Sequence, residues 1–360
     1  MLVPTARRVN RGIIYILSTN YTMSYKVIAS GHLEFGNARS FERMIQSYQQ
    51  RLETYYKNDI FLRPEELWAG DSTFLSIPRR TVQAAEKTWR NTVNLLESIV
   101  QFAMAGSVSL WKLDNGAMLE HVVIEPRCEK SAVQSFLLGR ELISKGKRGE
   151  AKEALNQAIE KFERHALAYE RRGYVNFMLN NFEDAAYDFS KSIDINPNNP
   201  EAYVGRALVR MTKGTFPAAL ADLEIALKTS IPHQPIYWKA RRLKGEIYLE
   251  QEEYAMAEKE LRDFTNRPFK AEDPNGPWLR RAWYNYGRTL LGLSRYPEAV
   301  AAFNRSMELE SAKDHIATAD QLYFRGVALQ KAGQEGYSKD LYAAAEQGSE
   351  RAARLLEMNV

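Results

Sequence analysis

Gly139, Gly173 and Ala207 are evenly spaced along the sequence, and the same local pattern surrounds each of them. At one constant distance after these small residues stands an alanine, at Ala151, Ala185 and Ala219. A pattern that recurs at this period indicates stacked two-helix units, because one such unit cannot bury its apolar face alone. We therefore expect a helical repeat array, which favours an interaction protein over an enzyme.

The clearest unit spans residues 169–199 and contains, at regular places, Tyr169, Gly173, Phe182, Ala185, Phe189 and Pro197. With these residues at these positions, the unit resembles the tetratricopeptide repeat (TPR) family. Arg172 departs from the family pattern, in which leucine is usual at that place. In physical terms, the small Gly173 and Ala185 let two helices approach closely, and the aromatic rings fill the space around that contact. Pro197 ends the second helix, because proline cannot continue one.

The same register predicts five to six helix pairs over residues 131–345, followed by a capping helix at residues 349–358. The key small position falls at residues 139, 173, 207, 245, 287 and 326. The longer gaps predict insertions between repeats, at residues 230–235 and 271–277. The resemblance implies an all-α TPR superhelix over residues 131–360.

In the TPR family, the first helix of each pair lines a concave groove that binds peptides. Carried onto this sequence, the partner-binding candidates are Phe136, Arg140, Tyr174, Phe177, Lys239, Arg242, Arg281, Tyr284, Asn285, Arg288 and Tyr323. Tyrosine and arginine dominate binding hot spots, so we expect a peptide with acidic and aromatic residues. Two other interpretations stay open. The aromatic rings can belong to the core between repeats, or the groove can be filled by the chain itself or by a second copy.

Some TPR proteins hold the carboxylate tail of chaperones through lysine and asparagine in the first repeat. Here Phe136 and Arg140 occupy the matching positions. The sequence therefore does not predict chaperone-tail binding of that kind.

Residues 23–127 have a different pattern, which predicts a small α+β domain. We expect strands at residues 24–35, 59–63, 72–77, 107–113 and 117–125, and helices at residues 40–57 and 80–104. Asn37 is a plausible N-cap, and Asp114-Asn115-Gly116 is a strong hairpin signal. Two amphipathic helices would cover one face of a mostly antiparallel sheet, in a ferredoxin-like arrangement. This domain resembles no family, and dimerisation or a second docking surface is its expected role.

Residues 1–22 are expected to form a loose extension, with Met23 beginning the folded part. The only cysteine, Cys128, excludes an intrachain disulfide and fits a reducing compartment, so we expect a cytoplasmic protein. The net charge of +4 is too small to argue for nucleic acid by itself.

A search for catalytic and cofactor motifs yields no phosphate loop, dinucleotide fingerprint or paired metal-ligand spacing. The five histidines are scattered along the chain. We therefore expect no enzyme, cofactor or metal, and a protein-interaction scaffold or adaptor whose partner is another protein. One alternative is an enzymatic or ligand-sensing N-terminal domain that the array regulates, for which the marker is a deep polar pocket in residues 24–126. The other is nucleic-acid binding through a basic groove, for which the marker is strong salt dependence.

Overall fold

The computed structural model describes residues 5–8, 13–16, 24–68, 73–310 and 315–358. The chain forms two compact units. The N-terminal unit contains residues 1–137 and 157–165, and the array unit contains residues 138–156 and 166–360. The domain limits expected near residues 127 and 131 stay a prediction.

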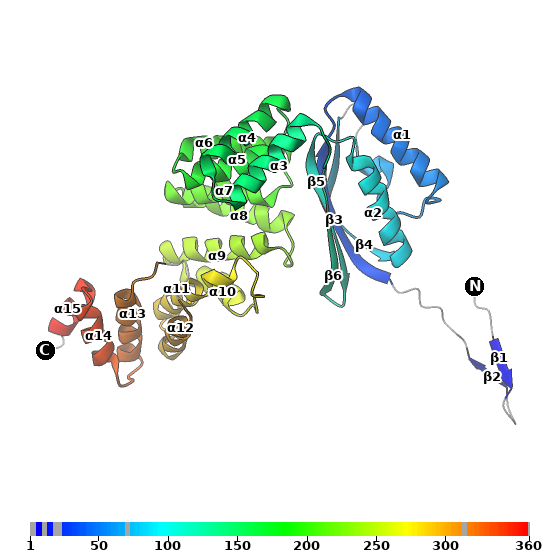
Figure 1. Ribbon diagram of the computed structural model, residues 1–360. Helices are drawn as coiled ribbons and strands as arrows, with labels where there is room; N and C mark the ends of the chain where they lie inside the picture. Colours follow the sequence, from blue (N-terminus) through cyan, green and yellow to red (C-terminus); the bar gives the residue numbers. More distant parts are fainter. Residues whose placement is uncertain (1–4, 9–12, 17–23, 69–72, 311–314, 359–360) are drawn as a thin grey trace. The chain divides into compact units, whose positions relative to one another are not determined.

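The N-terminal unit is built on a four-stranded antiparallel sheet in the order β4-β3-β5-β6 (Figure 1). The strands are β3 (Ser24–Glu34), β4 (Phe74–Ala85), β5 (Ala105–Asp114) and β6 (Ala117–Ile124). The predicted hairpin joins β5 to β6, and its turn residues Asn115 and Gly116 have φ values of 46° and 83°. The turn thus has positive φ at both central positions, as the sequence predicted.

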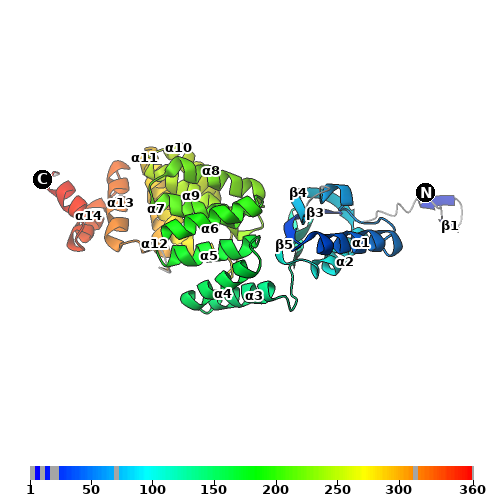
Figure 2. The same cartoon turned by 90° about the horizontal axis from the view of Figure 1, so that it is seen from above.

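Two helices, α1 (Ala38–Thr54) and α2 (Glu86–Val100), cover one face of this sheet (Figure 2). The Asn37 side chain accepts a hydrogen bond from the Ser40 backbone N–H at 2.9 Å, which confirms the predicted cap. The apolar stripes of both helices enter one core, with Trp89 and Tyr48 among its largest buried side chains. The expected α+β architecture with two helices on an antiparallel sheet is therefore confirmed.

Three details of the N-terminal prediction are wrong. Residues 59–63 form no strand, and a 3-10 turn, η1 (Pro64–Glu66), follows them. Residues 80–85 belong to β4 and not to a long helix, because they pair with β3 up to Ala85 opposite Ser24. The element order is β-α-β-α-β-β, whereas a ferredoxin-like domain requires β-α-β-β-α-β.

Within residues 1–22, expected to form a loose extension, β1 (Thr5–Arg8) and β2 (Ile13–Ile16) pair as a separate two-stranded antiparallel sheet. The extension itself stays a prediction. Met23, where we expected the folded part to begin, lies outside the described residues.

The remaining chain forms the predicted helical array, and from α5 to α14 the two helices of each pair lie side by side (Figures 1 and 2). Six helix pairs and a last helix account for the described part of residues 131–358. The helices are α3 (Ser131–Ser144), α4 (Arg148–Lys161), α5 (Ala166–Met178), α6 (Phe182–Ile195), α7 (Pro200–Thr212), α8 (Phe216–Thr229), α9 (Pro235–Glu250), α10 (Tyr254–Thr265), α11 (Leu279–Gly292), α12 (Tyr296–Glu308), α13 (Thr318–Lys331), α14 (Tyr337–Glu346) and α15 (Glu350–Glu357). The predicted insertions fall between α8 and α9 and between α10 and α11, where η2 (Gly276–Trp278) lies.

The key small residues lie where each hairpin is tightest. A Cβ added at Gly173 would lie 3.1 Å from the Phe189 ring, and one added at Gly287 would lie 2.7 Å from the Phe303 ring. The phenylalanine follows the glycine at the same sequence interval in both hairpins, which confirms the predicted register. Close helix packing in the array thus depends on the absence of a side chain at these positions.

Candidate functional site

The first helices of the second, third and fourth hairpins together line a pocket in the array unit. Helices α5, α7 and α9 are neighbours, and the cavity between them has a volume of about 120 Å³. Apolar walls come from Phe177, Val204, Leu208 and Ile236, and polar walls come from Glu170, Arg171, Glu201 and Lys239. We call this cavity the α5–α7–α9 pocket.

Three of the predicted partner-binding residues meet in this pocket, namely Tyr174, Phe177 and Lys239. Tyr174 is 38% exposed, so its ring is partly open to a partner. Phe177 packs its ring against Phe182 with centroids 5.6 Å apart, which holds the Phe177 side chain in place. The structure therefore places Lys239, which is distant in sequence, in the same cavity as Tyr174 and Phe177.

The polar side of the pocket carries two acidic and two basic groups. Glu170 is 4% exposed, and the Arg171 Nε atom lies 3.1 Å from its Oε2 atom. Burial raises the pKa of the Glu170 carboxyl group. Burial, followed by the charge of Arg242, lowers the pKa of the Lys239 ammonium group. Both groups therefore lose solvation in the folded chain, which makes them costly to leave without hydrogen bonds.

Arg242 contributes less free surface than the sequence suggested, and Arg281 stays partly exposed. Arg242 is 3% exposed, donates to Glu246 at 2.5 Å and stacks its guanidinium over the Trp278 ring at 4.2 Å. Arg281 lies 3.8 Å from the same Glu246 carboxylate. The two arginines therefore share one internal acid, and the Arg281 side chain is still 43% exposed.

The C-terminal candidates divide between core and surface. Tyr284 and Asn285 are only 8% and 5% exposed, which corrects the expectation that they line an open groove. Tyr284 packs between the rings of Phe303 and Phe324, and burial raises its pKa to about 12. Arg288 covers the Tyr284 and Phe324 rings, and Tyr323 is half-buried against Phe324. These rings form the core between repeats, as one of the two alternative interpretations of the aromatic residues stated.

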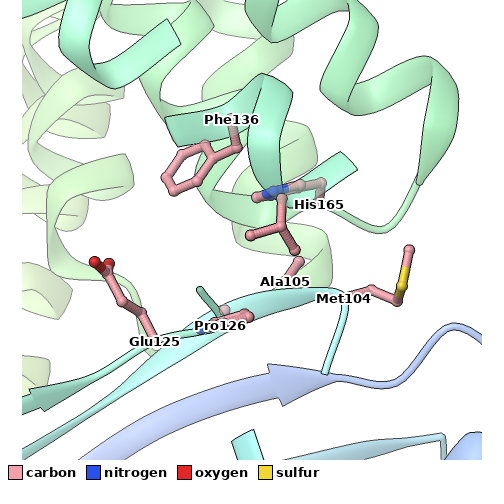
Figure 3. A pocket seen from close by; sticks show the side chains of 8 residues that line it. Met104, Ala105, Glu125, Pro126, Phe136 and His165 are labelled. Carbon is pink, nitrogen blue, oxygen red and sulfur yellow. The ribbon is translucent and has the colours of Figure 1, made fainter. Parts of the chain in front are cut away.

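The two candidates in the first repeat, Phe136 and Arg140, are also at least partly buried. Phe136 is 6% exposed and its ring lies 4.7 Å from that of His165, so it is buried and does not line an open groove (Figure 3). The small cavity beside these rings has a volume of about 10 Å³, enough for one water molecule at most. Burial lowers the pKa of His165 to about 4, which keeps the ring neutral at pH 7. Arg140 is half-buried.

A buried polar cluster in the N-terminal unit was missed by the sequence analysis. Glu34, only 1% exposed, accepts two hydrogen bonds from Arg164 Nε and one at 2.8 Å from Arg164 Nη2. Its Oε1 atom also lies 2.9 Å from His32 Nε2. Arg164 follows Glu34 by 130 residues, so no local sequence pattern could have revealed the pair.

The Glu34 cluster predicts an acid-sensitive contribution to stability. Burial would raise the Glu34 pKa, but the hydrogen bonds from His32 and Arg164 outweigh burial and lower it below the ordinary 4.5. A lowered folded pKa means that the contribution is complete above about pH 4.5 and is lost as pH falls through the folded pKa. We expect the difference in unfolding free energy between the native chain and Glu34→Gln to shrink between pH 6 and pH 3, measured by urea denaturation. A constant difference would contradict this assignment.

A repeated ion pair stabilises four of the hairpins. The basic residue before the key small position pairs with an acid on the second helix of the same hairpin, as Arg172–Asp188, Arg206–Asp222, Lys244–Glu260 and Arg325–Asp340. Arg172 also donates to Asn156 of the preceding hairpin at 2.9 Å, and Arg206 donates to Ser190 at 3.2 Å. The departure from leucine at Arg172 is therefore a structural feature, and its signal was the repeated basic residue in the sequence.

Outside the array, the N-terminal unit has an open hollow of about 490 Å³ between α1 and η1. Its ionisable lining residues Glu53, Arg63 and Glu65 are not buried. This hollow is not the deep polar pocket that a ligand-sensing domain requires.

In the part of the chain that the structure describes, no group of three or more His, Cys, Asp or Glu side chains is arranged to hold a metal ion. Across the same residues, no helix has the length and apolarity needed to cross a bilayer.

The architecture and the pocket define an all-α array of antiparallel helix hairpins. Residues 136–200, 204–277 and 281–313 match family models described as tetratricopeptide repeat. This part of the chain belongs to the tetratricopeptide repeat family, whose members generally act as protein-interaction scaffolds. No curated protein sequence matches the chain.

Solved structures resemble the array. The pilF protein of Pseudomonas aeruginosa superposes with a TM-score of 0.52 at 13% identity, over 64% of this chain and 99% of that one. PilW, a type IV pilus biogenesis factor, gives 0.48 at 18% identity over 64% and 100%. YrrB, described as a TPR protein with an unusual peptide-binding site, gives 0.47 at 20% identity over 57% and 99%. At these identities the similarity concerns the fold alone.

Proposed function

We propose that this chain is a non-catalytic scaffold whose array binds an extended segment of a partner protein across helices α5, α7 and α9. The observation that carries the proposal is the α5–α7–α9 pocket, where half-open aromatic and polar side chains from three successive repeats converge. Peptides that bind such grooves gain affinity from buried aromatic contacts and from directed polar groups. Arg242 and Arg281 share the acid Glu246, and the Arg281 side chain stays partly exposed, which is compatible with an acidic residue in the peptide.

The proposal predicts that Tyr174→Ala weakens peptide binding about tenfold or more, as removal of an aromatic hot-spot side chain usually does. Peptides would be selected from a displayed random library on the full chain, and their affinities measured by calorimetry. Tyr187→Ala is the matched control, because Tyr187 is 56% exposed on α6 and does not line the pocket. Equal affinities for the native chain and Tyr174→Ala would place the peptide elsewhere.

For the N-terminal unit, we propose a second docking surface at β6 that joins two copies of the chain. The other edge strand, β4, is blocked by Pro78, which has no N–H, and by the adjacent exposed Arg79. Among the described strands, β6 has one unpaired edge, and it carries exposed Met118, Leu119 and Val123. Its Glu120 is neutralised by Lys112 at 2.7 Å, so this acid does not disfavour pairing along the edge.

This second surface predicts a dimer that Val123→Lys converts to a monomer, because a lysine on an edge strand disfavours pairing with another strand. Light scattering coupled to size-exclusion chromatography over a tenfold concentration range measures the mass. Tyr342→Lys is the control, since Tyr342 is 58% exposed on α14. A native chain that is monomeric throughout would reject the dimer and leave the peptide proposal intact.

The cytoplasm is the compartment we propose for this scaffold. Cys128, the only cysteine, is compatible with a reducing compartment. Fractionation of the native cell with an antibody to the chain tests this location.

A further inference from the structure

The α5–α7–α9 pocket contains an unmatched hydrogen-bond acceptor. The Glu170 Oε2 atom is fully buried and receives no hydrogen bond from the described residues. Arg171 Nε lies 3.1 Å away and supplies charge, but not the geometry of a hydrogen bond. A buried carboxylate oxygen without a donor is costly, so this atom is suited to receive a donor from outside the chain.

The same pocket contains an unmatched donor. Lys239 lines the cavity from α9, and among the described residues no acceptor lies within hydrogen-bonding or ion-pairing distance of its Nζ atom. Lys239 and Glu170 therefore do not pair with each other, although both face one cavity. Burial raises the Glu170 pKa and lowers the Lys239 pKa, which is consistent with two groups that lose solvation in the pocket.

We propose that the α5–α7–α9 pocket receives the carboxamide of a partner glutamine or asparagine side chain. The carboxamide NH₂ would donate to Glu170, and its carbonyl oxygen would accept from Lys239. This inference rests on the proposed peptide-binding function and specifies the chemistry of one peptide position.

The balance of charge in the pocket favours a neutral group over an ion. Glu170 and Glu201 are offset by Arg171 and Lys239, so an added cation or anion would leave one buried charge uncompensated. A carboxamide satisfies both unmatched atoms and adds no charge. The cavity of about 120 Å³ is large enough for a short polar side chain, and Val204, Leu208 and Ile236 can cover its methylene groups.

The test uses capped amino acids as probes on the full-length chain, which separates this inference from the identity of the partner. N-acetyl-glutamine methylamide, its arginine and glutamate analogues, and N-acetyl-alanine methylamide would each be titrated against chain labelled at isoleucine and valine methyl groups. Methyl NMR shifts of Ile236 and Val204 report on the pocket, and those of Ile99, in the core of the N-terminal unit, serve as the reference. The glutamine probe is expected to bind tightest, with saturable shifts confined to Ile236 and Val204.

Two variants test the two proposed hydrogen bonds one at a time. Glu170→Gln and Lys239→Met should each weaken binding of the glutamine probe about tenfold or more, which is the loss of one hydrogen bond to a charged group. Preference for the arginine probe, strengthened by Lys239→Met, would overturn the carboxamide in favour of a cation. Preference for the glutamate probe, strengthened by Glu170→Gln, would overturn it in favour of an anion.

The alanine probe separates the two sources of an amide. Equal binding of the alanine and glutamine probes would assign the pocket to a backbone amide and overturn the side-chain proposal. If none of the probes shifts the methyl signals of Ile236 and Val204, the proposal is also overturned, because the cavity would then hold water alone. The peptide-library test of Tyr174 is independent of this result, because it requires no particular side chain at the peptide position that enters the pocket.

Discussion

Replacing Gly173 by leucine is expected to lower the unfolding free energy of the array by about 3 kcal/mol, because the substitution overfills a closed helix contact. An added Cβ would already lie 3.1 Å from two ring carbons of Phe189 and 3.2 Å from Asp188 Cβ. Phe189 is 1% exposed, so its ring has no solvent-filled space into which it can move. Urea denaturation followed by circular dichroism measures the loss.

Gly149→Leu is the matched control for this prediction. Gly149 lies in the first turn of α4, and nothing lies within 4 Å of a Cβ added there. Leucine has the higher helix propensity, so this variant should be as stable as the native chain or slightly more stable. If both variants unfold at the same urea concentration, α5 and α6 do not touch at Gly173 and the repeat register is incorrect.

The second large effect is expected for Asp222→Ala, which should destabilise the array by about 2–3 kcal/mol, because breaking a buried ion pair is strongly destabilising. Asp222 is 2% exposed and holds Arg206 through two hydrogen bonds of 2.8 and 3.0 Å. It also accepts from Arg210 at 2.7 Å. Removing the Asp222 carboxylate takes this acceptor from two partly buried guanidinium groups, those of Arg206 and Arg210. The 19% and 30% exposure of the two arginine side chains reduces the cost below that of a fully buried pair.

Glu298→Ala is the control for the ion pair. The Arg295–Glu298 side chains are 41% and 56% exposed, and such surface pairs contribute between 0 and about 1 kcal/mol. In thermal and urea unfolding, Asp222→Ala should therefore be clearly less stable than Glu298→Ala. An Asp222→Ala variant that is as stable as Glu298→Ala would show that the repeated ion pairs do not stabilise the hairpins.

The array was predictable because its determinants are local and periodic. Gly173, Ala185 and their equivalents recur at fixed spacing, and each fixes a contact within a single hairpin. The repeated basic residue at Arg172 was visible in the sequence too. Its acidic partner became evident only when the two helices were placed side by side.

The N-terminal errors arose where long-range pairing overrides local preference. Residues 80–85 contain helix-forming alanine and glutamine, yet pairing with β3 holds them in a strand. The pair between Glu34 and Arg164 joins segments 130 residues apart, which no periodic pattern can reveal. For the same reason no local pattern separates Tyr174, which is half-open, from Tyr284, which lies in the core.

The array and its pocket together support one proposed function. Small residues and repeated ion pairs hold the hairpins together, and the stacked first helices form the α5–α7–α9 pocket. Because this pocket combines an open tyrosine with unmatched polar atoms, it is suited to hold a peptide of a partner protein. The N-terminal unit would add a second surface that brings two arrays together.

The most direct test of the central claim is site-specific photocrosslinking in the native cell. The photoreactive residue p-benzoylphenylalanine would replace Tyr174 in one chain and Tyr187 in another, and crosslinked peptides would be sequenced by mass spectrometry. We expect position 174 to capture a discrete segment of one partner protein, whereas position 187 does not capture that segment. If a folded chain gives no crosslink at position 174, or the same crosslinks at both positions, the pocket is not the partner-binding site.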